Sequence, residues 1–178
     1  MKKIVLRQGL YGIIVMTVVS ATTYLIFHHR ENWDLQEILG YITIVLSLSF
    51  VYFGIRQWRD QYNGGQLSFG RGLAIGTLIT LLPSVAFGFL SWLEVSVIDP
   101  GFNDRYYANY VAQVKKATPP DKLAAALEKL AAEKEMFNSP FMQFFVMFLT
   151  VFIIGVIITV VSSLILRRNK PVITKTSV

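Results

Sequence analysis

The chain alternates long apolar segments with short polar ones. Four of the apolar segments are long enough to cross the hydrocarbon core of a membrane as α-helices, which takes about 20 residues. They lie at about residues 4–27, 38–55, 72–98 and 141–166. The pattern therefore predicts an all-α fold, an integral membrane four-helix bundle that forms a single domain over residues 1–178.

The first apolar segment could also be a cleavable secretion signal with a cleavage site near Ala21. Its apolar character, however, continues through residues 24–27, well beyond that site. We therefore expect this segment to be retained as the first transmembrane helix.

The polar segment between the third and fourth apolar segments, at about residues 99–139, has helical patterns of its own. Phe102, Tyr106 and Tyr110 recur every four residues, which predicts one amphipathic helix. The Thr-Pro-Pro-Asp stretch that follows has the features of a new helix start, with Thr118 as its N-cap. We expect an extracytoplasmic helical hairpin that folds on itself or lies over the bundle.

Lysine and arginine are concentrated on one side of the membrane if the chain crosses it four times. The residues on that side are Lys2, Lys3, Arg7, Arg56, Arg59, Arg71, Arg167, Arg168, Lys170 and Lys175. The first turn on the other side offers only Arg30, and residues 99–139 balance six basic with six acidic residues. Because cytoplasmic loops carry the excess of basic residues, we predict that both termini and the central connector are cytoplasmic.

The composition agrees with a membrane protein, since hydrophobic residues make up 53% and charged residues 16% of the 178 residues. The net charge of +6 could indicate a nucleic acid partner, but the basic residues fall at the ends of apolar segments. We interpret the charge as an orientation signal, with the lipid bilayer as partner and no nucleic acid. The absence of cysteine excludes disulfides, thiolate metal sites and cysteine nucleophiles.

Small residues recur at every fourth position of the third apolar segment. They are Gly72, Gly76, Thr80, Ser84 and Gly88. The fourth segment carries a shorter series of Gly155, Thr159 and Ser163. Because small residues let helix backbones approach closely in lipid, we predict that both stripes are helix-packing surfaces and that the fourth helix is a candidate partner of the third.

Two further features of the third segment are candidates for ion or proton transport. Pro83 should kink the helix and free the carbonyl of Ile79, which the hydroxyl of Thr80 or Ser84 could partly compensate. Glu94 is the only acidic residue within a predicted span, and intramembrane carboxylates often mark ion or proton paths. Because Glu94 lies near the end of that span, reaching the outer interface is the simpler interpretation.

The connector between the second and third segments is rich in arginine. Its candidates for binding anionic lipid headgroups or a cytoplasmic partner are Arg56, Arg59, Asp60 and Arg71. The alternative is a topology anchor with a solvated ion pair. Arg56 and Asp60 are four residues apart, so the second helix should continue past the membrane surface. Gly64 and Gly65 should end it, and Ser68 should cap the third helix.

The turn after the first segment contains ligand types for zinc. They are His28, His29, Glu31 and Asp34. Adjacent histidines on a helix point in different directions, and the chain has no His-x-x-x-His pair. We therefore favour an interfacial turn and expect neither a metal site nor another cofactor.

The connector residues resemble the central motif of a known family. The residues on which this resemblance rests are Phe53-Gly54-Ile55-Arg56-Gln57-Trp58-Arg59-Asp60, Gly64-Gly65, Ser68-Phe69-Gly70-Arg71-Gly72, and later Trp92, Asp99-Pro100-Gly101-Phe102 and Arg167-Arg168. This set is similar to the bacterial four-helix membrane proteins known as domain of unknown function 4199. The resemblance extends over nearly the whole chain and implies a bundle in the bacterial inner membrane, with no known reaction.

These observations favour a non-enzymatic membrane bundle that acts by association with itself, with lipids or with other membrane proteins. The alternative is a small transporter or channel component that uses Glu94 and the Pro83 kink. An embedded enzyme ranks third, because no nucleophile with its base and no pair of intramembrane carboxylates can be assembled from the sequence.

Overall fold

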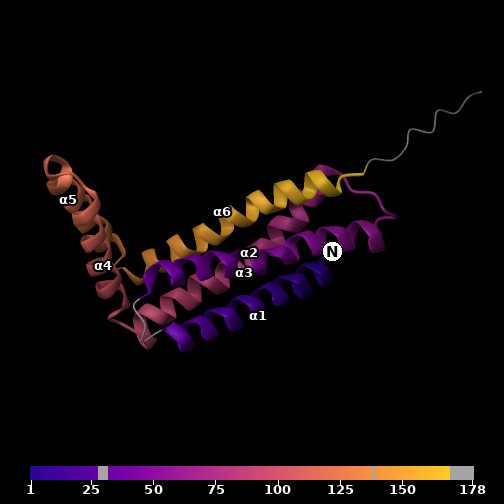
Figure 1. The fold of residues 1–178 in the computed structure, drawn as a ribbon. Coiled ribbons are helices and arrows are strands. Elements are labelled where there is room, and N and C mark those ends of the chain that lie inside the picture. The colour runs from indigo at the N-terminus through magenta and orange to yellow at the C-terminus, as the bar shows by residue number, and fades with distance from the viewer. Residues whose placement is uncertain (28–31, 138, 169–178) are drawn as a thin grey trace, which may run out of the picture.

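The computed structural model describes residues 1–27, 32–137 and 139–168. Over these ranges the chain is helical and forms no β-strand, as predicted. The helices are α1 (Lys2–Phe27), α2 (Trp33–Gln57) with its π-helical extension η1 (Trp58–Tyr62), α3 (Phe69–Leu93) with its π-helical extension η2 (Glu94–Ile98), α4 (Phe102–Ala117), α5 (Pro120–Phe137) and α6 (Pro140–Leu166). Figure 1 shows α1, α2, α3 and α6 alongside one another, with α4 and α5 beyond one end of them.

Four helical segments are long and apolar enough to cross a membrane, namely α1, α2 with η1, α3 with η2, and α6. The four predicted apolar helices are confirmed, and their length and composition indicate a membrane protein. The second span begins at Trp33, earlier than the predicted residue 38, because Asn32 caps it. The Asn32 Oδ1 atom accepts a hydrogen bond of 3.2 Å from the N–H of Leu35. Asp34 in the first turn also suits the positive end of the helix dipole.

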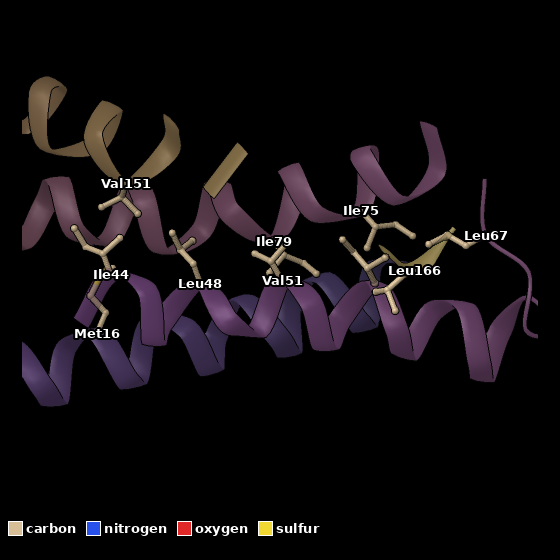
Figure 2. Close-up of a cluster of buried hydrophobic side chains, with 10 residues drawn as sticks. Met16, Ile44, Leu48, Val51, Leu67, Ile75, Ile79, Val151 and Leu166 are labelled. Atoms are coloured by element: carbon tan, nitrogen blue, oxygen red, sulfur yellow. The ribbon is translucent and has the colours of Figure 1, made fainter. Parts of the chain in front are cut away.

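The four long helices pack in a defined order. The α3–α6 pair is the most extensive, α2 contacts both of its members, and α1 packs against α2 and α3. Buried apolar side chains form a row from Ile44 and Val151 near one end to Leu67 and Leu166 at the other (Figure 2). Other faces of these helices expose large apolar side chains such as Ile157, which suits helices surrounded by lipid tails.

Polar side chains tie α1 to α2 at two levels. The buried Ser47 hydroxyl donates a hydrogen bond of 2.8 Å to the carbonyl of Gly12. Nearer the N-terminus, Gln8 Nε2 donates to Gln57 Oε1 at 3.1 Å. Hydrocarbon offers no partner to such groups, so pairing between helices is the way to satisfy them within a membrane.

The connector between η1 and α3 reverses the chain at two glycines. Gly64 and Gly65 have φ angles of 58° and 78°, the left-handed region that glycine adopts without strain, as predicted. The N–H of Gly65 donates to the carbonyl of Arg59 at 2.8 Å and closes the end of η1. Leu67 and Arg168 then exchange two backbone hydrogen bonds of 2.9 Å and 3.0 Å. This bridge joins the connector to the C-terminal end of α6.

The helix starts agree only in part with the sequence-based expectations. Ser68 occupies the N-cap position of α3, as predicted, but its side chain makes no capping hydrogen bond, and the same is true of Ser139 at the N-cap of α6. The predicted N-cap at Thr118 is wrong, because α5 begins at Pro120 and Thr118 instead ends α4. The N–H of Thr118 donates to the carbonyl of Val114 at 3.0 Å. Thr118 precedes a proline, which disfavours helical backbone, and its φ of −100° and ψ of 131° are extended.

Helices α4 and α5 contact each other beyond the end of the long helices. Lys134 of α5 links them, since its Nζ atom lies 2.8 Å from Asp104 Oδ1 and 4.8 Å from the ring centroid of Tyr107. Trp33, at the start of α2, packs edge-on against Phe102, with the ring centroids 5.7 Å apart. These aromatic and ionic contacts attach α4 to α2 and α5 to α4.

Candidate functional site

The structure brings the two stripes of small residues together between α3 and α6. All eight of the stripe residues are buried. Gly76 faces Thr159, and Gly155 faces Thr80, so each threonine fills the space that a glycine leaves on the other helix. The hydroxyl oxygens of Thr80 and Thr159 lie 3.4 Å apart. We call this interface the α3–α6 seam.

The seam extends to both ends of the stripes. A Cβ added to Gly72 would lie 2.8 Å from Ser163 Oγ, and a Cβ added to Gly88 would lie 2.8 Å from the carbonyl oxygen of Phe144. Such distances are shorter than any side chain tolerates without movement of its neighbour. The stripes are therefore used inside the chain, and their residues offer no exposed surface to a second copy.

Helix α3 continues through Pro83, which is buried. The hydroxyl of Ser84 donates to the carbonyl of Thr80 at 2.8 Å, one residue after the Ile79 carbonyl that the proline was expected to free. Pro83 lies against α1, where a Cβ added to Gly12 would be 3.6 Å from its ring. The proline therefore belongs to a helix interface.

Arg56, Arg59 and Asp60 form a small cluster where α2 continues into η1, with Arg59 the least exposed of the three. Arg59 Nε lies 2.6 Å from Asp60 Oδ1, and Arg56 Nε lies 3.6 Å from Asp60 Oδ2, so the predicted pairing of Arg56 with Asp60 is present but is the longer of two. Arg71 is exposed in the first turn of α3 and forms no ion pair with the residues that the structure describes. Exposed pairs of this kind contribute little to stability.

The residues of zinc-ligand type in the first turn lie mostly outside the part of the chain that the structure describes, since His28, His29 and Glu31 are not in the described ranges. Asp34 lies in the first turn of α2. Among the described residues, no three His, Cys, Asp or Glu side chains come close enough to share a metal ion.

A large open cavity lies where α4 and α5 meet the ends of the long helices. Its volume is about 790 Å³, and all six α-helices contribute residues to its wall. This volume is within the range of about 300–1,000 Å³ that is typical of small-molecule sites. We call it the hairpin-end cavity. Pro83 and the seam glycines do not line it.

Two buried polar side chains form part of the floor of the hairpin-end cavity. Gln143 of α6 is 5% exposed, and Ser91 of α3 is 9% exposed. Within the described ranges, neither the Gln143 amide nor the Ser91 hydroxyl has a hydrogen-bond partner, whereas Thr43 beside them donates to the carbonyl of Leu39 at 2.7 Å. Buried polar groups are nearly always paired, so these two face a space that a polar ligand or water would fill.

Glu94, the predicted ion or proton site, lines the same cavity and is half-buried at the start of η2. Its backbone carbonyl accepts a hydrogen bond of 2.7 Å from the N–H of Asp99. Glu37 of α2 also lines the cavity and is exposed at its rim. Neither glutamate forms an ion pair with any described residue.

The other charged groups of the cavity wall are neutralised. Arg105 pairs with Asp99, and Lys134 pairs with Asp104. Glu133 has Lys129 at 3.9 Å. Among the described residues of the wall, the two glutamates are therefore the acidic side chains without an ion pair, and the balance of charge is negative.

Both α4 and α2 contribute aromatic rings to the wall. Trp33 packs edge-on against Tyr106, with the ring centroids 5.7 Å apart, and Tyr106 stacks on Tyr110 at 6.2 Å. Burial raises the pKa of Tyr106 above its ordinary value, and the nearby Glu37 carboxylate raises it further. The Tyr106 phenol therefore stays protonated at neutral pH and offers a hydroxyl donor beside Glu37.

Among the residues that line this cavity, sequence reasoning named only Glu94 as a candidate ion or proton site. Glu37 and Gln143 were missed because the apolar segments were taken to start at residues 38 and 141, so each polar side chain fell at or near a boundary. Their signal was nevertheless present, since Gln143 is the only amide in α6. The Tyr106 and Tyr110 stripe was interpreted as a packing face. In the structure Tyr106 does pack on Trp33, but both tyrosines also line the cavity.

Comparisons with known proteins gave one match. A search of the curated proteins and a search of the solved structures each found none. Residues 8–168 match the model of the family described as Protein of unknown function (DUF4199), a range that includes the connector, the α3–α6 seam and every residue of the cavity wall. Since the match extends over most of the chain, the protein belongs to the DUF4199 family, as its resemblance predicted.

Proposed function

We propose that the protein is a multi-pass protein of the bacterial inner membrane, with both termini in the cytoplasm and with α4 and α5 as a hairpin on the outer side. The N-terminus, the connector and the end of α6 lie at the end of the long helices opposite α4 and α5 (Figure 1). The described basic residues of that end are Lys2, Lys3, Arg7, Arg56, Arg59, Arg71, Arg167 and Arg168. The positive-inside rule assigns such an end to the cytoplasm.

Within that location we propose a non-enzymatic binding function, with the hairpin-end cavity as the binding site. The observation that carries this proposal is a cavity of about 790 Å³ whose wall includes two mostly buried polar side chains, Gln143 and Ser91, with no hydrogen-bond partner among the described residues. Their polar atoms face the cavity space, so a ligand that enters can hydrogen-bond to them in place of water. A lipid or another membrane-soluble molecule fits this mostly apolar setting.

Association with other chains would use a different surface. The small-residue stripes that suggested association lie inside the α3–α6 seam. A second copy or another membrane protein would instead meet the exposed apolar faces of the long helices, and anionic lipids would meet the Arg56–Arg59–Asp60 cluster at the cytoplasmic end. The cavity is the more specific of these sites, because it combines shape with unpartnered donors and acceptors.

A matched pair of serine variants tests the binding function. Ser91→Phe fills the cavity, whereas Ser96→Phe places the same ring at an exposed position of η2 outside it. We expect native mass spectrometry of the detergent-purified protein to show a bound small molecule in the wild type and in Ser96→Phe, and its loss in Ser91→Phe. Equal retention in both variants, or no bound molecule in any of the three, would contradict the proposal.

A second candidate function is that of a small transporter or channel component. The position of Glu94 in the cavity wall favours it, because a half-buried carboxylate at the end of a span suits an ion or proton site. Pro83 gives it no support, since the proline lies at the α1 interface. In reconstituted vesicles Glu94→Gln should abolish any proton-coupled flux that the wild type shows, and unchanged flux would remove this candidate.

A further inference from the structure

We propose that the ligand of the hairpin-end cavity is an amphiphile with an ammonium head, whose cation binds near the Glu94 carboxylate while its apolar part lies against the inner wall of the cavity. This inference rests on the proposed binding function and adds the chemical class of the ligand. Three features of the cavity lead to it: its charge, its rings and its apolar depth.

The charge of the cavity wall favours a cationic ligand. Within the described ranges the wall carries six side chains of Asp, Glu, Lys or Arg, and four of them form ion pairs, namely Asp99, Arg105, Glu133 and Lys134. The two that remain are the carboxylates of Glu37 and Glu94. Arg105 and Lys134 already hold carboxylates, so an anionic ligand would have to displace them, whereas a cation meets Glu94 directly.

The rings of the wall suit a cation as well. Trp33, Tyr41, Tyr106 and Tyr110 all line the cavity on the side of Glu37. Aromatic faces attract ammonium groups, and indole and phenol rings are stronger in this than the ring of phenylalanine. Lys134 over the ring of Tyr107, at 4.8 Å from the centroid, is an example of such a contact in the same wall. Glu37 and these rings at the rim would attract the cation, and Glu94 further in would hold it.

The size and the apolar lining of the rest of the cavity indicate that the ligand also has an apolar part. A volume of about 790 Å³ is far larger than an ammonium group alone needs. Apolar side chains from several helices complete the lining, among them Phe27, Ile44, Phe87 and Met147. The cavity also lies where the apolar spans end and the polar hairpin begins, which is the depth of lipid headgroups. An aminophospholipid and a free alkylamine both have this chemistry, and the experiment separates them.

The experiment uses the tryptophan at the cavity as its reporter. Trp58→Phe combined with Trp92→Phe leaves Trp33, which lines the cavity, as the only tryptophan of the chain. The full-length protein is placed in nanodiscs of phosphatidylglycerol, which has no ammonium group, and titrated with octylammonium or with the neutral octanol. We expect a saturable change of Trp33 fluorescence, with at least about tenfold tighter binding of octylammonium than of octanol.

Variants of the two glutamates test whether the preference for octylammonium arises in the hairpin-end cavity. Glu94→Gln should weaken octylammonium binding about tenfold and Glu37→Gln about threefold, because Glu37 is exposed and its charge is screened. Binding of octanol should stay unchanged in both variants, which shows that the cavity is intact. Glu128→Gln, at an exposed position of α5 outside the cavity, is the matched control and should change neither affinity.

The lipid composition identifies the source of the ammonium group. If the ligand is an aminophospholipid, phosphatidylethanolamine in the nanodisc will occupy the cavity and abolish the octylammonium response. If it is a free amine, the response will persist. Equal affinities for octylammonium and octanol, unaltered by the glutamate variants, would overturn the ammonium inference while leaving a binding cavity. No saturable binding of either probe in any nanodisc would overturn the binding function itself.

Discussion

The α3–α6 seam and the hairpin-end cavity differ in packing although α3 and α6 contribute to both. In the seam, Thr80 and Thr159 fill the space beside glycines of the opposite helix, and the Ser163 hydroxyl is buried without a hydrogen-bond partner in the described part of the chain. In the cavity, Ser91 and Gln143 of the same two helices also have no partner among the described residues, but they line an open space. Close packing thus leaves no room for a ligand along the stripes, whereas the cavity leaves room beside its polar groups.

The largest effect is expected from breaking the seam. Gly76→Leu drives a side chain into Thr159, and overpacking of a tight interface costs about 1–3 kcal/mol or more. We expect the melting temperature of the detergent-solubilised protein to fall by several degrees, or the fold to be lost. Gly70→Leu is the matched control on the same helix, because a Cβ at Gly70 meets no atom within 4 Å. Similar melting temperatures for the two variants would show that the seam is loose.

Single cysteine substitutions can measure how accessible the seam and the cavity are to water, since the chain has no cysteine of its own. Ser91 is 9% exposed in the cavity wall and Ser163 is 0% exposed in the seam. A membrane-impermeant thiol reagent added from the outer side should modify Ser91→Cys at least about ten times faster than Ser163→Cys. A faster reaction of Ser163→Cys would contradict this prediction, because it would mean that water reaches the seam more easily than the cavity.

A smaller effect is expected from removing the unpartnered amide of Gln143 from the cavity wall. Gln143→Leu replaces the buried amide with an apolar side chain of similar size, and we expect the ligand-free protein to gain about 1 kcal/mol of stability while ligand binding weakens. Thermal unfolding with and without the bound molecule measures both effects. Gln113→Leu, at an exposed position of α4, should change neither. A loss of stability in Gln143→Leu would mean that its amide is satisfied.

The smallest effect concerns the α4–α5 contact that covers the cavity. The hydrogen bond from Lys134 lowers the pKa of the Asp104 carboxyl, so the pair stabilises the hairpin above the ordinary aspartate pKa, and this contribution disappears as the pH falls through the lowered value. At pH 7 trypsin should therefore cut α4 and α5 faster in Asp104→Asn than in the wild type. The difference between the two proteins should shrink as the pH falls through the lowered pKa and the carboxyl takes up its proton, which digestion with pepsin at successively more acidic pH can follow. Equal trypsin rates at pH 7 would show that the pair contributes nothing.

The helical architecture could be predicted from the sequence because it depends on local patterns. The length of the apolar segments gave the four spans, and Gly64 and Gly65 gave the turn after η1. The stripes also suggested α6 as a partner of α3, since close approach requires small residues on both helices.

The cavity could not be predicted in the same way, because it depends on where α4 and α5 lie relative to the long helices. Glu37, Ser91 and Gln143 are far apart in sequence and share a wall only after the chain has folded. Each of them alone looks like an ordinary polar residue near a helix end. Local patterns also misplaced the start of α5, since two consecutive prolines allow the helix to begin at either one.

The bridge between Leu67 and Arg168 has a mechanical consequence. It ties the connector before α3 to the residues just after α6, while Gly88 of α3 approaches the Phe144 carbonyl of α6 near the other end. Sliding of α3 along α6 would have to break contacts at both ends. We therefore expect movements that admit or release a ligand to come mainly from α1, α2 or the hairpin.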